Sequence, residues 1–143
     1  MAVLDTRRVL EKLVSMRAAS RCSKDERAQL LEMADGIEKA GQNENVETYL
    51  QYHFEIKRFV ALCARNKFAE RALRPLHTFS QRFYFAHYRS FNNLQVVGLA
   101  HAELTRAIVA SDEVLVASHC DHVSDIAEQF TQDLLRGQGS FKV

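Results

Sequence analysis

Three histidines of this sequence lie at helical spacing within otherwise apolar rows, and each could bind a metal ion or an acidic ligand. They are His53, His101 and His122. A neutral imidazole ligates zinc and similar metals, and it also donates or accepts a hydrogen bond. One histidine on an apolar face is usually a hydrogen-bonded core residue, but three on separate elements form a pattern. The pattern predicts that the three side chains converge around one bound ion or carboxylate.

Three cations accompany the histidines on or beside the predicted inward faces. Lys57 follows His53 by one turn, Arg7 lies in the row Val3-Arg7-Leu10-Val14, and Arg82 borders a later row. An unpaired buried ammonium is strongly destabilising, so Lys57 should have an anionic partner. We expect a carboxylate or phosphate ligand in that role, with Arg7 and Arg82 as further anchors. His77 is expected to lie exposed or at the rim.

The segment that carries His53 and Lys57 is predicted to be the central helix. Residues 46–66 are apolar on nearly all sides, which is typical of a helix at the centre of a bundle. Elsewhere one proline and five glycines leave few turn signals, while apolar residues recur at helical spacing. The chain is therefore predicted to be all-α, with six to seven helices and neither repeats nor an internal linker.

Capping and turn signals predict the limits of the other helices. The expected elements are a helix over about 2–20, one over 24–40 opened by a capping box at Ser23, one over 67–88 kinked or restarted at Pro75, one after a capping box at Asn92, and a last one capped by Ser111-Asp112. Residues 1–136 thus form one domain. The Gly-Gln-Gly-Ser run within residues 137–143 predicts a flexible tail.

Composition excludes several kinds of partner. The net charge of +1 is too balanced for these residues to bind a DNA backbone. No run approaches the about 20 apolar residues of a membrane span, and the first residues lack a signal-peptide core. Cys22, Cys63 and Cys120 have neither zinc nor redox spacing, and we expect buried free thiols. A cytoplasmic protein without membrane contact is therefore expected.

Several short stretches occur in an order that matches a known family. They are Arg7-x-x-Leu-Glu, the central helix closing on Asn66, Ser80-Gln-Arg-Phe-Tyr-Phe, the stretch from His101 through Ala107-Ile108 to Asp112, and His122. Together they resemble the C-terminal effector-binding domain, of FCD type, of GntR-family regulators of the FadR subfamily. The resemblance covers essentially the whole chain. It implies an antiparallel helical bundle whose central cavity binds a small organic acid, often through a divalent metal held by an Asp and three His.

The metal-binding pattern of that family is altered here. Its central helix normally carries Asp-x-x-x-His, nine residues before a closing Asn. Counting back from Asn66 places His53 at the Asp position and Lys57 at the His position. A protonated lysine does not ligate metal, whereas His53, His101 and His122 could hold Zn²⁺ or a Ni- or Mn-like ion with an open position. Metal binding and direct ligand binding by Lys57 both stay open.

The resemblance implies a ligand-sensing and dimerising domain of a transcription regulator, without catalysis. Its winged-helix DNA-binding domain is absent from this chain, so DNA would be contacted only through that missing domain. A homodimer is expected because such regulators read two half-sites. One alternative is a metal-dependent helical-bundle enzyme using the three histidines, although Glu55 and Glu103 lie off their rows. Another is a plain interaction domain, which the absence of a cavity would support.

Overall fold

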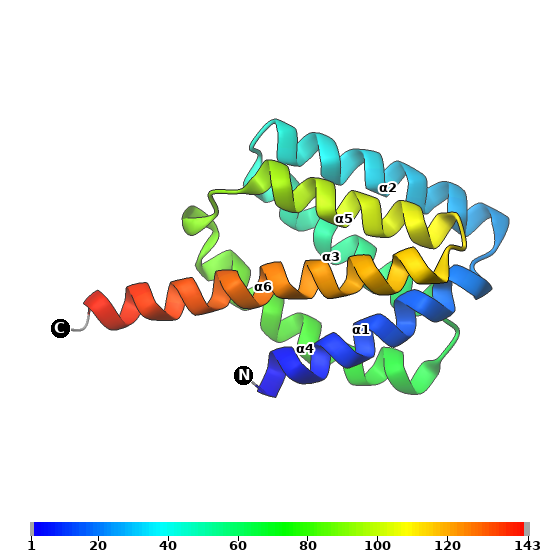
Figure 1. Cartoon of the computed structure of the whole chain (residues 1–143), viewed down its shortest axis with the longest axis horizontal. Coiled ribbons are helices and arrows are strands. Elements are labelled where there is room, and N and C mark those ends of the chain that lie inside the picture. The colour runs from blue at the N-terminus through cyan, green and yellow to red at the C-terminus, as the bar shows by residue number, and fades with distance from the viewer. Residues whose placement is uncertain (1, 142–143) are drawn as a thin grey trace.

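The structure is a computed structural model that describes residues 2–141, including their side chains except those of residues 88 and 138–141. The described chain is all-α, as predicted, and contains no strand (Figure 1). Its elements are α1 (Ala2–Arg21), α2 (Lys24–Gln42), α3 (Val46–Cys63), α4 (Lys67–Ala86), the 3-10 turn η1 (Tyr88–Ser90), α5 (Leu94–Val109) and α6 (Glu113–Phe141). None of these helices has the length and apolar composition needed to cross a membrane.

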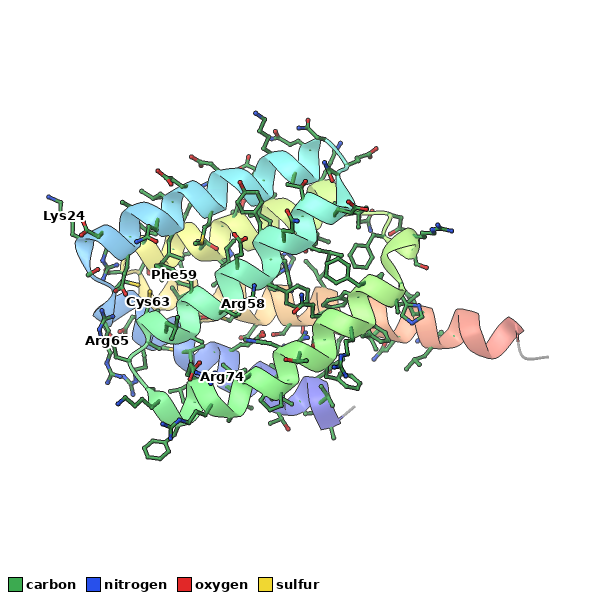
Figure 2. The ribbon with its side chains drawn as sticks, turned by 180° about the vertical axis from the view of Figure 1, so that it is seen from behind. Lys24, Arg58, Phe59, Cys63, Arg65 and Arg74 are labelled. Carbon is green, nitrogen blue, oxygen red and sulfur yellow. The ribbon has the colours of Figure 1, made fainter. Side chains whose placement is uncertain are left out.

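The helices form an antiparallel bundle with α3 in contact with four others. Helices α2 and α5 lie side by side and run in opposite directions, while α1 and α4 form the opposite edge of the bundle (Figure 1). Helix α3 contacts α1, α2, α4 and α5. One of its sides remains exposed, with Arg58 at the surface (Figure 2). Leu62 on the same helix is 59% exposed. The predicted central helix is therefore central in its contacts without being enclosed.

Side-chain caps begin α2 and α6 as predicted. The Ser23 hydroxyl accepts a hydrogen bond from the Glu26 amide at 3.1 Å, and the Glu26 carboxylate accepts one from the Ser23 amide at 2.8 Å. The Asp112 carboxylate accepts from the Leu115 amide at 3.1 Å in the first turn of α6. These bonds satisfy amides that have no partner within the helix, which fixes where each helix starts.

Three predicted boundaries differ from the structure. Asn92 forms no capping box, because α5 begins at Leu94 and its N-cap, Asn93, makes no side-chain cap bond. Helix α4 is not restarted at Pro75, since one lost backbone bond at an exposed position leaves its packed face intact. Helix α6 continues to Phe141 across the expected tail, because glycine weakens a helix without ending it. Flexibility of residues 137–141 stays a prediction, and residues 142–143 lie outside the described residues.

Two glycines allow α2 and α5 to approach closely. A Cβ atom on Gly41 would lie 2.6 Å from the Leu94 carbonyl oxygen, and one on Gly98 would lie 3.0 Å from the Ile37 carbonyl oxygen. Both obstacles are backbone atoms, which cannot rotate away as a side chain can. The contact between these helices therefore requires glycine at position 41.

We expect Gly41→Ala to lower the free energy of unfolding by about 1–3 kcal/mol, the usual cost of overpacking a tight contact. Urea denaturation of both proteins measures the change. Gly137→Ala is the matched control, since no atom of the described side chains lies within 4 Å of its added Cβ. There the better helix propensity of alanine should leave stability unchanged or raise it by up to about 1 kcal/mol. Equal effects at the two positions would contradict the close-packing argument.

Candidate functional site

A cavity of about 240 Å³ lies in the bundle, between α1, α3, α5 and α6. Tyr84 of α4 and the residues around the start of α5 complete its wall. The polar and aromatic side chains that line it include Arg7, Glu11, Tyr49, His53, Lys57, Tyr84, Phe91, His101, Phe130 and Asp133. The predicted central cavity is thus present, which argues against a plain interaction domain.

Two of the three predicted histidines meet in this cavity. The rings of His53 on α3 and His101 on α5 have centroids 4.6 Å apart and are nearly perpendicular, at 86°. Tyr49 and Tyr84 pack against the His53 ring at centroid distances of 5.8 and 5.7 Å. The Nδ1 atom of His53 is buried and has no hydrogen-bond partner among the described residues. A buried polar atom without a partner is destabilising, so a group that reached it would bind favourably.

Burial keeps both histidines neutral. Desolvation, followed by electrostatic repulsion from His101 and Lys57, lowers the pKa of His53 well below its usual range. Desolvation and the Lys57 charge lower the pKa of His101 to about 3. Each neutral ring has one nitrogen that donates and one that accepts. The pair therefore offers hydrogen bonds rather than positive charge to a ligand at pH 7.

The positive charge of the site comes from a buried cluster around Glu11. Its Oε2 lies 3.1 Å from the Lys57 ammonium, and its Oε1 lies 3.0 Å from Nε2 of His77 and 3.6 Å from Nε of Arg7. Burial alone would raise the pKa of Glu11, but the charges of Lys57 and Arg7 and the hydrogen bond to His77 hold it well below its usual range. The anionic partner that Lys57 requires is thus supplied by the protein itself.

Arg7 connects this cluster to α4. Its guanidinium donates to the Ser80 hydroxyl at 2.5 Å and to the Tyr84 hydroxyl at 3.5 Å. Within this cluster one carboxylate, Glu11, faces two cations, Arg7 and Lys57, so one positive charge remains unbalanced there. The other carboxylate that lines the cavity, Asp133, is exposed and pairs with Arg136 at 3.8 Å. The unbalanced charge lies in a buried environment, where an anion would be attracted more strongly than in water.

His122 does not join the other two histidines. Its side chain is exposed on α6 and does not line the cavity. Apolar spacing in the sequence predicts an inward row of Leu115, His119, His122, Ile126 and Phe130. In the first half of α6 the buried residues are instead Val116, Cys120 and Val123, one position further along, and Leu115 is 48% exposed. Only Ile126 and Phe130 of the predicted row line the cavity. A shift of one residue turns a helix by about 100°, which carries His122 from the inward face to the surface. The three-histidine arrangement is therefore corrected to a pair.

Arg82 also lies outside the site, for a similar reason. The buried row of α4 contains Leu73, His77, Ser80 and Tyr84, so Arg82 points to solvent. The same shift buries His77, which was expected at the surface or rim. Apolar spacing in the sequence predicts Leu76, Phe79 and Phe83 as the inward row; Leu76 and Phe83 pack partly against the core, whereas Phe79 is 49% exposed.

The sequence prediction missed Glu11, although a signal for it existed. Glu11 follows Arg7 by four residues, which places both side chains on one face of a helix. Because Arg7 was predicted to face inward, a buried acidic neighbour could have been inferred from that spacing. Ser80 and His77 carried no such signal, since their partners Arg7 and Glu11 lie 73 and 66 residues away in the chain.

The cavity does not fit the divalent metal that the resemblance implies. It brings together two imidazoles, while its buried carboxylate, Glu11, is engaged by Lys57, Arg7 and His77. Two cations beside the imidazoles would repel a third. Among the described residues, three possible ligand atoms lie within 4.8 Å of one another only at Cys22, Glu26 and Cys63, none of which lines the cavity.

Comparison with solved structures supports the same architecture. The chain is similar to E. coli McbR/YncC, with a TM-score of 0.78 and 15% sequence identity, and the match covers 92% of this chain and 67% of that one. At this identity the similarity establishes the fold alone. Among curated proteins, no relative matches the sequence significantly.

Comparison with family models extends over most of the sequence. Residues 2–125 match the model of the FCD domain. The matched range runs from the start of α1 into α6 and includes every cavity residue contributed by α1, α3, α4 and α5. The chain therefore belongs to the FCD domain family.

Proposed function

We propose that this FCD domain is the ligand-sensing part of a GntR/FadR-type transcription regulator of the cytoplasm, and that it binds a small organic-acid metabolite in its central cavity. Ligand binding would control DNA binding by a fused winged-helix domain. One observation carries the proposal. The cavity places a neutral histidine pair beside a buried cluster with one unbalanced positive charge.

The chemistry of the cavity favours a small monoanion. A single carboxylate would match the unbalanced charge of Arg7 and Lys57, and His53 and His101 would supply further hydrogen bonds. Tyr49, Phe91 and Phe130 add aromatic surface for an apolar part of the ligand. A volume of about 240 Å³ lies below the about 300–1,000 Å³ of drug-sized pockets, which favours a compact molecule.

In the proposed site, Arg7 and Lys57 attract the acidic ligand, as a metal ion does in the family pattern. No catalysis is proposed. A metal-dependent enzyme would need a third ligand and a general base. Glu55 and Glu103, the two carboxylates expected off the histidine rows, are both exposed. Glu11, the buried carboxylate, is held ionised by its neighbours and is a poor proton acceptor.

We expect isothermal calorimetry with a series of short aliphatic and aromatic monocarboxylic acids to find saturable binding for at least one acid and none for its neutral amide. The uncharged amide keeps the shape but loses the attraction of Arg7 and Lys57. His53→Leu should weaken binding by at least about tenfold, which corresponds to the loss of one good hydrogen bond. A metal chelator should leave the affinity unchanged.

His122→Leu is the matched control for the ligand experiment. It removes another histidine of the same predicted set, but one that is exposed and outside the cavity. Its affinity should equal that of the unaltered protein. Loss of binding on chelation would restore a metal site, and turnover of the acid by metal-loaded protein would favour the enzyme instead.

The proposal also includes a homodimer. Neighbouring helices α1 and α4 carry apolar side chains that are unusually exposed in the single chain, among them Val9 at 68% and Phe68 at 85%. We expect a dimer because regulators that read two DNA half-sites need two-fold symmetry, and these exposed side chains are candidates for the contact surface. Equilibrium sedimentation at micromolar concentration should give a dimer. A monomer would mean that another part of the regulator supplies the contact.

A further inference from the structure

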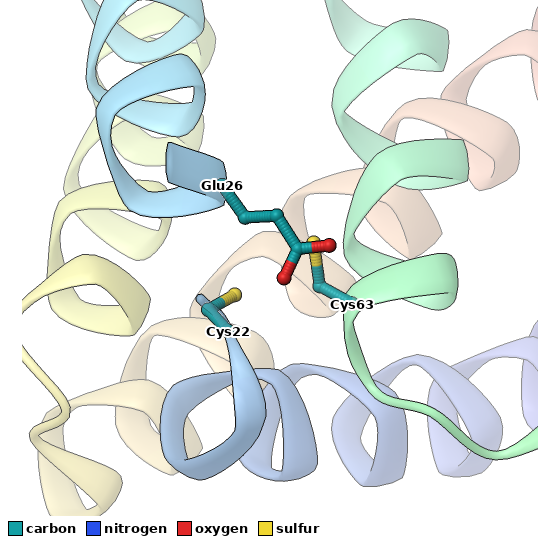
Figure 3. Close-up of side chains that lie close together, drawn as sticks. All are labelled: Cys22, Glu26 and Cys63. Carbon is teal, nitrogen blue, oxygen red and sulfur yellow. The ribbon is translucent and has the colours of Figure 1, made fainter. Parts of the chain in front are cut away.

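Two cysteines and a glutamate meet at the end of the bundle that is remote from the histidine pair. Cys22 follows α1, Glu26 lies in the first turn of α2, and Cys63 ends α3. Figure 3 shows the three side chains directed toward one another, and one sulfur or oxygen atom of each lies within 4.8 Å of the others. Cys63 is ten residues after His53, or about 15 Å along the helix. The group is therefore separate from the ligand cavity.

Cys22 and Cys63 are neighbouring thiols in a protected position. Both are free, and they are 8% and 0% exposed. The hydrogen bond from Cys63 lowers the pKa of Cys22, with help from the charge of Arg27 and against the effect of burial. The same bond raises the pKa of Cys63. The two free thiols therefore lie close enough to interact with each other, at the ends of two helices that are distant in sequence.

Glu26 is fixed beside the thiols before any ion arrives. One carboxylate oxygen accepts from the Ser23 amide at 2.8 Å and lies 2.9 Å from the Arg65 guanidinium. The other oxygen takes part in neither bond. Figure 2 shows Cys63 and Arg65 at the same end of the bundle as Lys24, which begins α2. A preoriented carboxylate reduces the entropy lost when it becomes a ligand.

Two sulfurs and one oxygen select a particular class of cation. Thiolates prefer borderline or soft ions such as Zn²⁺ and Cd²⁺, whereas Mg²⁺ and Ca²⁺ prefer oxygen alone. Zinc–sulfur bonds of about 2.3 Å place two sulfur ligands of a tetrahedral site a little under about 4 Å apart. The separations of up to 4.8 Å are slightly larger, so small side-chain rotations would complete the geometry.

We propose that Cys22, Glu26 and Cys63 form a binding site for a thiophilic divalent cation of the zinc type, with water as the fourth ligand. The cation displaces the protons of both thiols, and these are released to solvent. Its two positive charges are balanced by the two thiolates, while Arg65 pairs with the added negative charge of Glu26 at 2.9 Å. Three helix ends that are distant in sequence become joined through one ion.

The test is a titration of the phosphine-reduced protein with Cd²⁺, followed by the ultraviolet charge-transfer absorption of cadmium thiolates. We expect the signal to saturate at one equivalent and Zn²⁺ to remove it by competition. Cys22→Ser and Cys63→Ser should each weaken binding by at least about tenfold, which even indirect changes at metal sites produce. Because Cys63 is fully buried, helical circular dichroism must confirm that its variant folds. If the Cys63→Ser variant does not fold, the cadmium titration of Cys22→Ser alone tests the site.

Cys120→Ser is the matched control, because Cys120 is also a buried free thiol but lies outside the group. It should keep the full signal, and so should His53→Leu, which alters only the cavity. A titration without saturation at one equivalent, a signal that survives Cys22→Ser, or a signal that requires Cys120 would each overturn the proposal. None of these results would affect binding of an acid in the cavity.

Discussion

Glu11→Gln should lower the free energy of unfolding by about 3–5 kcal/mol, the loss found when one partner of a buried ion pair is removed. The amide keeps the shape of the side chain but leaves Lys57 and Arg7 without a counter-charge. Both cations are largely buried, with side-chain exposures of 13% and 9%, so water cannot replace the carboxylate well. Urea denaturation at pH 7 measures the loss.

Glu70→Gln is the matched control for this large effect. Glu70 also pairs with an arginine, at 2.6 Å, but Arg74 is 70% exposed, so the variant should lose less than about 1 kcal/mol. Lys57→Met should lower the free energy of unfolding by an amount between those of Glu11→Gln and Glu70→Gln, because Glu11 keeps its contacts with Arg7 and His77. If Glu11→Gln proves as mild as Glu70→Gln, the buried cluster does not stabilise the fold.

Lowering the pH from about 6.5 to 5 should reduce the free energy of unfolding by about 3 kcal/mol through His53 and His101. The pKa of each is depressed in the folded protein, so the unfolded chain takes up protons first as the pH falls. Their stabilising contribution is fully present above the unfolded pKa of about 6.5, and it declines by about 1.4 kcal/mol per pH unit for each histidine. Urea denaturation at the two pH values gives the difference.

The groups that face the two histidines reinforce this acid sensitivity. Lys57 and Arg7 oppose a further positive charge, while Glu11 is already ionised and paired with them. His101→Gln should remove about half of the pH dependence. His122→Gln is the matched control, because it removes a histidine that is exposed and lies outside the cavity. A pH profile that depends on His122 and not on His101 would contradict the assignment.

Much of the fold could be predicted because its signals are local. Ser23 with Glu26, and Asp112, mark helix starts through bonds that span three residues. His53 and Lys57 could be placed on α3 by apolar spacing, since the neighbouring inward positions are apolar. The meeting of His53 and His101 followed from the two inward rows, once the resemblance had supplied the arrangement of the bundle.

The side chains whose orientation was wrongly predicted lie on helices that have two neighbouring rows of residues, either of which could face the core. On α4 the apolar row that the sequence favours contains Phe79, which is 49% exposed, whereas the row that is buried contains His77 and Ser80. Hydrophobicity alone therefore favours the wrong face, and the correct one is selected by bonds to Glu11 and Arg7 on a distant helix. On α6 the two rows are similarly apolar, so the sequence does not distinguish the side that carries His122.

The shared carboxylate at Glu11 limits the order in which mutations could have produced this site. A lysine that arises at position 57 while position 11 is neutral would be a buried charge without a partner, at a cost close to the whole stability of many small domains. A glutamate that arises first already has Arg7 and His77 as neighbours. Lineages that change one residue at a time would therefore acquire the acid before the lysine, and would lose them in the reverse order.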